Sequence, residues 1–234
     1  MNYDYVYNED CILKEACPRK KKIGCDKHCT IQPEFMYLFE TSNIPHDMKA
    51  KKILYPSDID IPSFETMKSI QLDIEHFVGE GRILYLWSKQ PGVAKTTMAC
   101  KLLKTYLAVV CIGNGFRDRA YFAYVPSLLL LAKEFKDENR STTLEALNTL
   151  DLVVLDDIGA VQNSNYDLTI LSNIIDTRYR NGKSTIYTSN LSPSNLKDVI
   201  GTRLADRVCS DIVLELKGRS RRRGTNTYVR RNES

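Results

Sequence analysis

The sequence predicts an α/β fold with a five-stranded, mostly parallel sheet. Short apolar runs alternate with helical patterns from Ser63 onward, and the run 152–155 is apolar throughout, as in a strand buried on both faces. With 234 residues, 43% hydrophobic and 26% charged, the chain has the size and balance of one globular domain plus a small module. No apolar run is long enough to span a bilayer, and the N-terminus lacks a signal-peptide pattern, so we expect no membrane partner and a cytoplasmic location.

The expected elements follow one another in a regular order. Apolar residues at helical spacing predict a helix from Ser63 to Val78, with Ser63 as its N-cap. Beyond this helix, the expected elements in chain order are strand 83–87, helix 95–110, strand 120–125, helix 127–135, strand 152–155, helix 168–179, strand 185–188, a short helix from Ser192-Pro193 and strand 212–216.

The loop after the first strand resembles a phosphate-binding loop. The octet from Lys89 to Thr96 fits the pattern G-x-x-x-x-G-K-[ST], except that Lys89 and Ala94 replace the glycines. Ala before the Lys also occurs in MCM-type helicases, so Lys89 is the odder departure. Such a loop directs backbone N–H groups and a helix N-terminus at phosphates, with the Lys on the β- and γ-phosphates and the Thr on Mg²⁺. The candidate ATP contacts are Gln90, Pro91, Gly92, Val93, Ala94, Lys95, Thr96 and Thr97.

Two later strands end in polar side chains. Asp156 and Asp157 follow the buried run 152–155, and Asn190 follows the strand 185–188. Strand ends are where α/β sheets place ligands, and the order of elements is that of an additional-strand P-loop ATPase. We expect Asp156 to hold Mg²⁺, Asp157 to polarise the attacking water and Asn190 to orient water beside the γ-phosphate. The strand 185–188 should lie between the strand 83–87, which precedes the phosphate-binding loop, and the strand 152–155, which precedes the aspartates.

Arginines flank the last expected strand. Arg203 and Arg207 precede it, and Arg222 follows it in a tail whose residues from Lys217 onward include seven basic and one acidic side chain. Arginine is suited to neutralising transferring phosphoryl groups. The tail can meet phosphates of nucleic acid or of a nucleotide, or it can be a solvated terminus.

These motifs together resemble the bacterial helicase-loader family, AAA+ ATPases related to the ATP-binding proteins of certain insertion sequences. The resemblance covers Ile83 to Arg222 and rests on Asp-Asp-Ile-Gly, Thr-Ser-Asn, the arginine pair and Gly-x-Ser-x-Arg. It implies an arginine finger at Arg207, acting on a neighbouring subunit, with Arg203 as second candidate, and a sensor-2 role for Arg222. It also implies an ATPase, weak because the loop is degenerate, that binds the hexameric replicative helicase, self-associates on its ring and helps place it on single-stranded DNA.

Four cysteines near the N-terminus suggest a metal site. In a cytosolic chain thiols are kept reduced, and four thiolates suit tetrahedral Zn²⁺. His28 could replace the last cysteine, and four unliganded thiols are the alternative. The resemblance agrees, because loaders from Firmicutes and their phages carry an N-terminal zinc module that docks on the helicase; the short chain and drifted loop favour a phage version. The expected zinc ligands are Cys11, Cys17, Cys25 and Cys29.

The sequence therefore predicts three zones: a zinc-binding, helicase-docking module over 1–45 with a helical stretch at 33–39, a linker over 46–62 and an AAA+ ATPase domain over 63–234. Two other functions remain open. One is an ATP-binding transposition protein that acts on duplex DNA, and the other is a small-molecule P-loop kinase.

Overall fold

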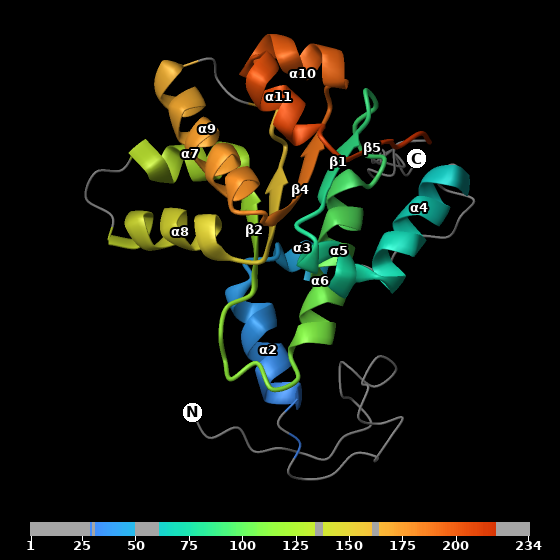
Figure 1. The fold of residues 1–234 in the computed structure, drawn as a ribbon, viewed down its shortest axis with the longest axis vertical. Coiled ribbons are helices and arrows are strands. Elements are labelled where there is room, and N and C mark those ends of the chain that lie inside the picture. The colour runs from blue at the N-terminus through green and yellow to red at the C-terminus, as the bar shows by residue number, and fades with distance from the viewer. Residues whose placement is uncertain (1–28, 30, 50–60, 134–137, 161–163, 219–234) are drawn as a thin grey trace, which may run out of the picture.

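A computed structural model describes residues 29, 31–49, 61–133, 138–160 and 164–218. Its sheet has five strands, every neighbouring pair of which is parallel, in the order β2-β3-β4-β1-β5 (Figure 1). The predicted five-stranded α/β fold is confirmed, and β4 lies between β1 and β3 as expected. The strands are β1 Ile83–Trp87, β2 Ala120–Tyr124, β3 Leu152–Asp156, β4 Ser184–Ser189 and β5 Ile212–Glu215.

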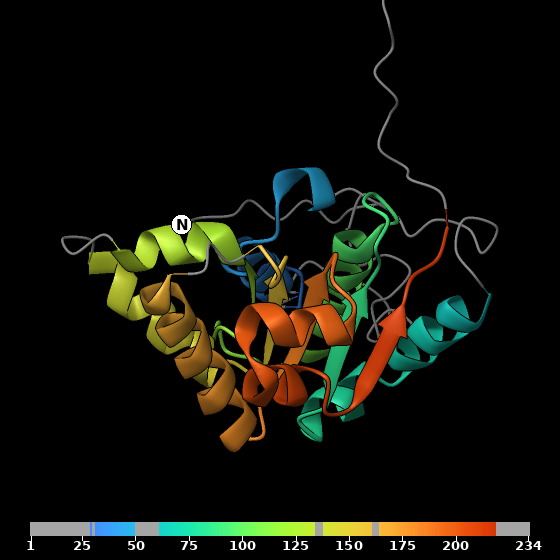
Figure 2. The ribbon, with the colours of Figure 1, turned by 90° about the horizontal axis from the view of Figure 1, so that it is seen from above.

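Helices cover both faces of the sheet (Figure 2). Because successive side chains of a strand point to opposite faces, Leu84 and Leu86 of β1 join one apolar cluster while Ile83 and Tyr85 join the other. The first cluster contains α2 Ile31–Thr41, α4 Ile61–Leu72, α5 Ile74–Gly79 and α6 Lys95–Val110. The second contains α7 Val125–Lys133, α8 Glu138–Thr149, α9 Asn165–Arg180, α10 Pro193–Ile200 and α11 Thr202–Val208. None of the helices in the described ranges is long and apolar enough to cross a membrane.

Several boundaries differ from the expected ones. The single helix expected over 63–78 is two helices, α4 and α5, and Ser63 lies inside α4 instead of capping it. Its hydroxyl donates to the carbonyl of Glu215 at 3.1 Å, so it joins α4 to the end of β5. Helix α7 starts at Val125 with Pro126 in its first turn, where a missing N–H costs nothing. Helices α8 and α11 were not expected.

The segment before the expected linker belongs to the sheet domain. Apolar side chains of α2 lie in the same cluster as α6, and the carbonyl of Ser42 accepts the backbone N–H of Phe122 on the outer edge of β2 at 2.8 Å. The short helix α3, His46–Lys49, accepts a hydrogen bond from Lys104 of α6 through the Met48 carbonyl at 3.0 Å. Residues 31–45 thus share the core of the sheet domain, although the sequence pattern assigned them to the module over 1–45. Residues 1–28 lie outside the described part.

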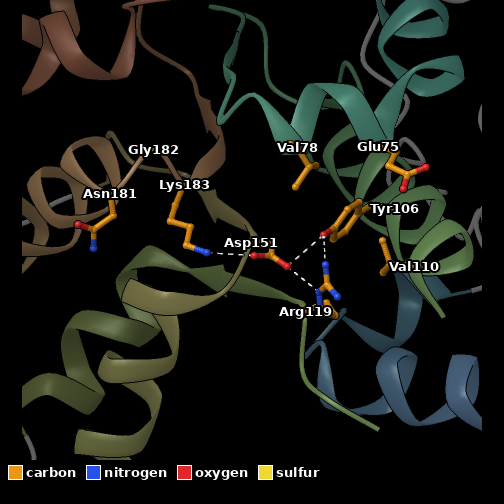
Figure 3. Close-up of a pocket in the computed structure, with 10 residues that line it drawn as sticks. Glu75, Val78, Tyr106, Val110, Arg119, Asp151, Asn181, Gly182 and Lys183 are labelled. Carbon is orange, nitrogen blue, oxygen red and sulfur yellow. Dashed lines mark hydrogen bonds and ion pairs between the residues drawn. The ribbon is translucent and has the colours of Figure 1, made fainter. Parts of the chain in front are cut away.

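The starts of three neighbouring strands are joined by one ionic network (Figure 3). Asp151, before β3, accepts from Arg119 Nε at 2.6 Å and from Lys183 Nζ at 3.0 Å, and Tyr106 donates to it at 3.3 Å. Although burial opposes the change, hydrogen bonds from Lys183 and Arg119 hold the pKa of Asp151 below its ordinary value. These residues line a cavity of about 310 Å³. Because each charge in the network has a partner, we interpret it as a structural tie.

A fully buried arginine stabilises the same end of the sheet, at which the strands start. Arg178 of α9 donates to the carbonyls of Leu147, Leu150 and Ser184 at 2.5, 2.9 and 2.5 Å and to Thr185 Oγ1 at 2.9 Å. It therefore satisfies carbonyls at the end of α8, which no further helical turn could satisfy. Burial lowers its pKa to about 10.

We expect Arg178→Met to lower the free energy of unfolding by about 3–5 kcal/mol, because it leaves several buried acceptors without a donor. Urea denaturation would measure the loss. Arg180→Met, on the exposed end of the same helix, is the control and should change stability by about 0.5 kcal/mol or less. Equal effects of the two substitutions would contradict the role of Arg178.

Candidate nucleotide-binding site

The lysine of the phosphate loop meets the polar end of the adjacent strand. Lys95 is the first residue of α6 and is only 9% exposed, and its Nζ donates to Oδ1 of Asn190 at 2.7 Å. The contact follows from topology: β1, which leads into the loop, pairs with β4, which ends next to Asn190. The structure therefore brings together two residues 95 positions apart.

A second contact links the loop to the acidic strand. Asp156, the last residue of β3, accepts hydrogen bonds on one oxygen, Oδ1, from Thr96 Oγ1 at 2.8 Å and from Thr188 Oγ1 at 2.6 Å. Burial raises the pKa of Asp156, and the Asp157 charge adds to this, while the two hydroxyl hydrogen bonds counteract it. A carboxylate flanked by hydroxyl oxygens is the kind of donor set that Mg²⁺ prefers, so these residues fit that ion.

Thr188 was not predicted as a site residue, yet it joins both aspartates. Besides donating to Asp156, its Oγ1 accepts the backbone N–H of Asp157 at 3.0 Å. Asp157 takes a left-handed conformation with φ of 60°, which aspartate tolerates better than most residues. The alternation of side chains between the two faces of β4 could have indicated Thr188, because Thr188 lies two positions before Asn190 and so on the same side of the strand.

The two departures from the glycine pattern have opposite consequences. Ala94 caps α6 with φ of 73°, the left-handed conformation for which the motif has a glycine. Lys89 is not among the described residues with positive φ, so a side chain there carries no strain. The odder departure in the sequence is thus the harmless one, and Ala94 is the strained one.

The other loop residues can offer mainly backbone groups. Val93 is 1% exposed, Gly92 has φ of 81°, and the N–H of Gln90 is bound by Ser88 Oγ at 3.2 Å. Pro91 is exposed. The hydroxyl of Thr97 lies 3.6 Å from Met48 Sδ in α3, away from the acidic strand.

The predicted arginines of α11 lie apart from this cluster. Arg203 and Arg207 both bind Asp176 on α9. Their helix precedes β5, which starts beside Leu84 near the beginning of β1, whereas the phosphate loop follows the end of β1. The start of β5 and the phosphate loop therefore lie at opposite ends of β1, a five-residue strand roughly 15 Å long.

The remaining predicted residues cannot be placed in the structure. Arg222, Cys11, Cys17 and Cys25, like the alternative ligand His28, lie outside the described residues. Cys29 is a half-buried free thiol that packs against the apolar cluster around α2. In the part of the chain that the structure describes, no group of three or more His, Cys, Asp or Glu side chains could hold a metal ion.

The fold and the cluster of Lys95, Thr96, Asp156 and Asn190 define a P-loop nucleotide-binding protein of the additional-strand class. Residues 49–227 match the family of IstB-like ATP binding proteins, which is well over half of the chain. The protein belongs to this ATP-binding family.

Curated relatives of the chain are replicative helicase loaders. It is 35% identical over 177 residues to DnaC of Buchnera aphidicola subsp. Schizaphis graminum, which covers 73% of this chain and 62% of that protein. It is 28% identical over 124 residues to DnaI of Bacillus subtilis, covering 51% of this chain and 36% of the relative. The match to DnaC of Buchnera aphidicola subsp. Baizongia pistaciae spans about half of that relative, 53% of its length.

Solved structures of replication proteins share the fold. A crystal structure of the DnaC helicase loader superimposes with a TM-score of 0.56 at 24% identity, covering 73% of this chain and 96% of that one. DnaI gives 0.58 at 21% identity, covering 75% and 95%. The replication initiator DnaA bound to AMPPCP and single-stranded DNA gives 0.58 at 16% identity, covering 75% and 51%.

We expect Ala94→Gly to stabilise the protein by about 0.5–1 kcal/mol, because relief of left-handed strain exceeds the added entropy of the unfolded chain. Lys89→Gly is the matched control at the other departure, and it should destabilise by about 0.4–1 kcal/mol because it adds only unfolded-state entropy. Thermal unfolding of both variants measures this difference. If both substitutions shift stability in the same direction, the conformational assignment is wrong.

Proposed function

We propose that this protein is an ATP-hydrolysing loader that binds a hexameric replicative helicase and helps place it on single-stranded DNA. The observation that carries the proposal is the convergence of Lys95 with Asn190 and of Thr96 with Asp156 at the ends of three adjacent strands. The chain belongs to an ATP-binding family, and relatives of the chain are named replicative helicase loaders.

Each side chain has a distinct task in this proposal. Lys95 gives up its contact with Asn190 and binds the β- and γ-phosphates, which leaves Asn190 to orient water. Thr96 and Asp156 hold Mg²⁺, which when bound neutralises phosphate charge. Asp157 polarises the attacking water, and the backbone of residues 90–94 and of Thr97 completes the phosphate cradle.

The arginines complete the site from two directions. Arg207, with Arg203 as second candidate, acts on the nucleotide of a neighbouring subunit, since α11 and the chain's own phosphate loop lie at opposite edges of the sheet. Arg222 contacts the γ-phosphate of its own chain. Hydrolysis then depends on self-association on the helicase ring.

The N-terminal residues and the basic tail supply the partner contacts. Zinc held by Cys11, Cys17, Cys25 and Cys29 folds a helicase-docking module, because a short polar segment gains its folding energy from the metal. The tail beyond Lys217 attracts nucleic-acid phosphates. We place this action in the bacterial cytoplasm, which is the host cytoplasm if the protein is phage-encoded.

A second candidate is an ATP-binding transposition protein on duplex DNA, which the name of the matched family favours. Helicase binding distinguishes the two, because a transposition protein would instead assemble on duplex DNA without helicase. A small-molecule kinase would have no use for an arginine acting in trans.

We expect the protein to co-elute with the replicative helicase of its host in size-exclusion chromatography with MgATP.

Lys95→Ala should lower ATP affinity roughly tenfold to a hundredfold, because it removes a charge-assisted phosphate contact worth about 1.5–3 kcal/mol. Lys89→Ala, an exposed lysine in the same loop, is the control and should bind ATP normally. Unchanged affinity in Lys95→Ala would refute the site, and assembly on duplex DNA alone would refute the loader.

We expect one zinc ion per chain in protein purified without chelator, as measured by elemental analysis. Cys17→Ser should lose the metal and helicase binding but retain ATP affinity, whereas Cys209→Ser, at a half-buried thiol beside α11, should retain the metal. Comparing His28→Ala with Cys29→Ser identifies the fourth ligand. A zinc-free wild-type protein would rule out the module.

A further inference from the structure

One buried carboxylate holds both arginines of α11. The Asp176 side chain is 8% exposed; its Oδ2 accepts from Arg203 Nη2 at 2.6 Å, and its Oδ1 is paired with Arg207 Nη1. The Arg207 guanidinium also lies over the ring of Tyr179, 5.5 Å from its centroid. Two guanidinium groups thus share one negative charge, so the group carries a surplus positive charge.

The two arginines differ in exposure. The side chain of Arg203 is 68% exposed and that of Arg207 is 23% exposed. A cavity of about 570 Å³ opens between α9 and α11 beside Arg203, and Ser172, Arg180 and Thr202 also line it. There is therefore room for a guanidinium to move and for an anionic group to enter next to Arg203.

Sharing the carboxylate makes the release of one arginine inexpensive. A buried carboxylate without a partner is strongly unfavourable. With two partners, Asp176 keeps one cation when the other leaves, so the buried carboxylate is never left without an opposite charge. If Asp176 had one arginine partner instead of two, the departure of that arginine would leave the buried carboxylate unpaired, which is strongly unfavourable.

We propose that Asp176 is the positioning residue for the arginine that acts in trans: it holds α11 on α9 through one guanidinium and lends the other to a neighbouring subunit's phosphates. The inference rests on the proposed ATPase function and adds a residue to it. In this proposal Asp176 acts through the two arginines that it binds.

Mixing variants tests this assignment, because a subunit that cannot donate an arginine still has an intact ATP site. Asp176→Asn alone should bind ATP normally and lose at least tenfold in turnover with helicase and single-stranded DNA present. Mixed in equal amounts with Lys95→Ala, which supplies intact arginines, it should recover at least twofold over either variant alone. Mixed with Arg207→Ala, which also cannot donate, it should not recover. Asp206→Asn removes the same charge from an exposed site on α11, where it pairs with Lys197, and should behave as wild type.

The mixture of Arg207→Ala with Lys95→Ala serves as the reference. If this pair recovers but Asp176→Asn with Lys95→Ala does not, or if Asp176→Asn recovers with Arg207→Ala, the assignment of Asp176 is overturned. If the reference pair fails, or wild type does not turn over ATP, the trans arginine or the ATPase function fails, and the inference fails with it.

The exposed Arg203 provides a second variant in case Asp176→Asn does not fold. Arg203→Ala leaves Arg207 as the one remaining partner of Asp176, so Arg207 cannot be lent freely. It should therefore show the same donor-side defect and the same rescue by Lys95→Ala. Wild-type turnover of Arg203→Ala would overturn the shared-carboxylate arrangement.

Discussion

One carboxylate oxygen at the end of β3 couples the elements on which the site depends. Oδ1 of Asp156 accepts from Thr96 at the start of α6 and from Thr188 in β4. A buried carboxylate is tolerated only when hydrogen bonds replace its water, so α6, β3 and β4 are fixed to one another at this point. The arrangement requires β4 to lie beside β3, and thus the strand order positions the phosphate loop against the acidic strand.

The opposite edge of the sheet supplies the fixed base for this arrangement. Arg178 joins α8, α9 and β4, and Asp151 joins the residues preceding β2, β3 and β4. Because the parallel strands are similar in length, fixing where they start also determines where they end. Side chains at the ends can therefore meet without long loops to position them. Arg178 also fixes the position of α9, the helix that contains Asp176. The arginines of α11, which bind Asp176, are therefore held in a fixed position relative to the site at the other end of the strands.

Local patterns were sufficient for much of this structure. The apolar strands, the helix 95–110 and the order of polar strand ends were predicted from the sequence, because each depends on nearby residues and on general rules of parallel sheets. Contacts that depend on tertiary packing were not. Nothing local to Ser63 indicates that its hydroxyl binds β5, and the apolar face of α2 does not reveal which surface covers it. Ala94 has a left-handed conformation that alanine rarely adopts, so its residue type did not predict it. Asp176 belongs to no sequence motif, because its proposed role depends on two arginines about 30 positions away.

Both halves of the proposed site hold their cations on groups of their own chain. Lys95 is bound to Asn190, and the arginines of α11 are bound to Asp176. In each case a phosphate must replace an existing partner, so the gain on binding is the difference between two contacts. The neutral amide of Asn190 is a weaker partner for a cation than a phosphate, which favours exchange within one subunit. The carboxylate of Asp176 is a strong partner, and exchange there is feasible because a second guanidinium remains. In the proposed mechanism the chain therefore binds nucleotide alone, whereas its arginines respond only to a neighbour that brings phosphates close to α11.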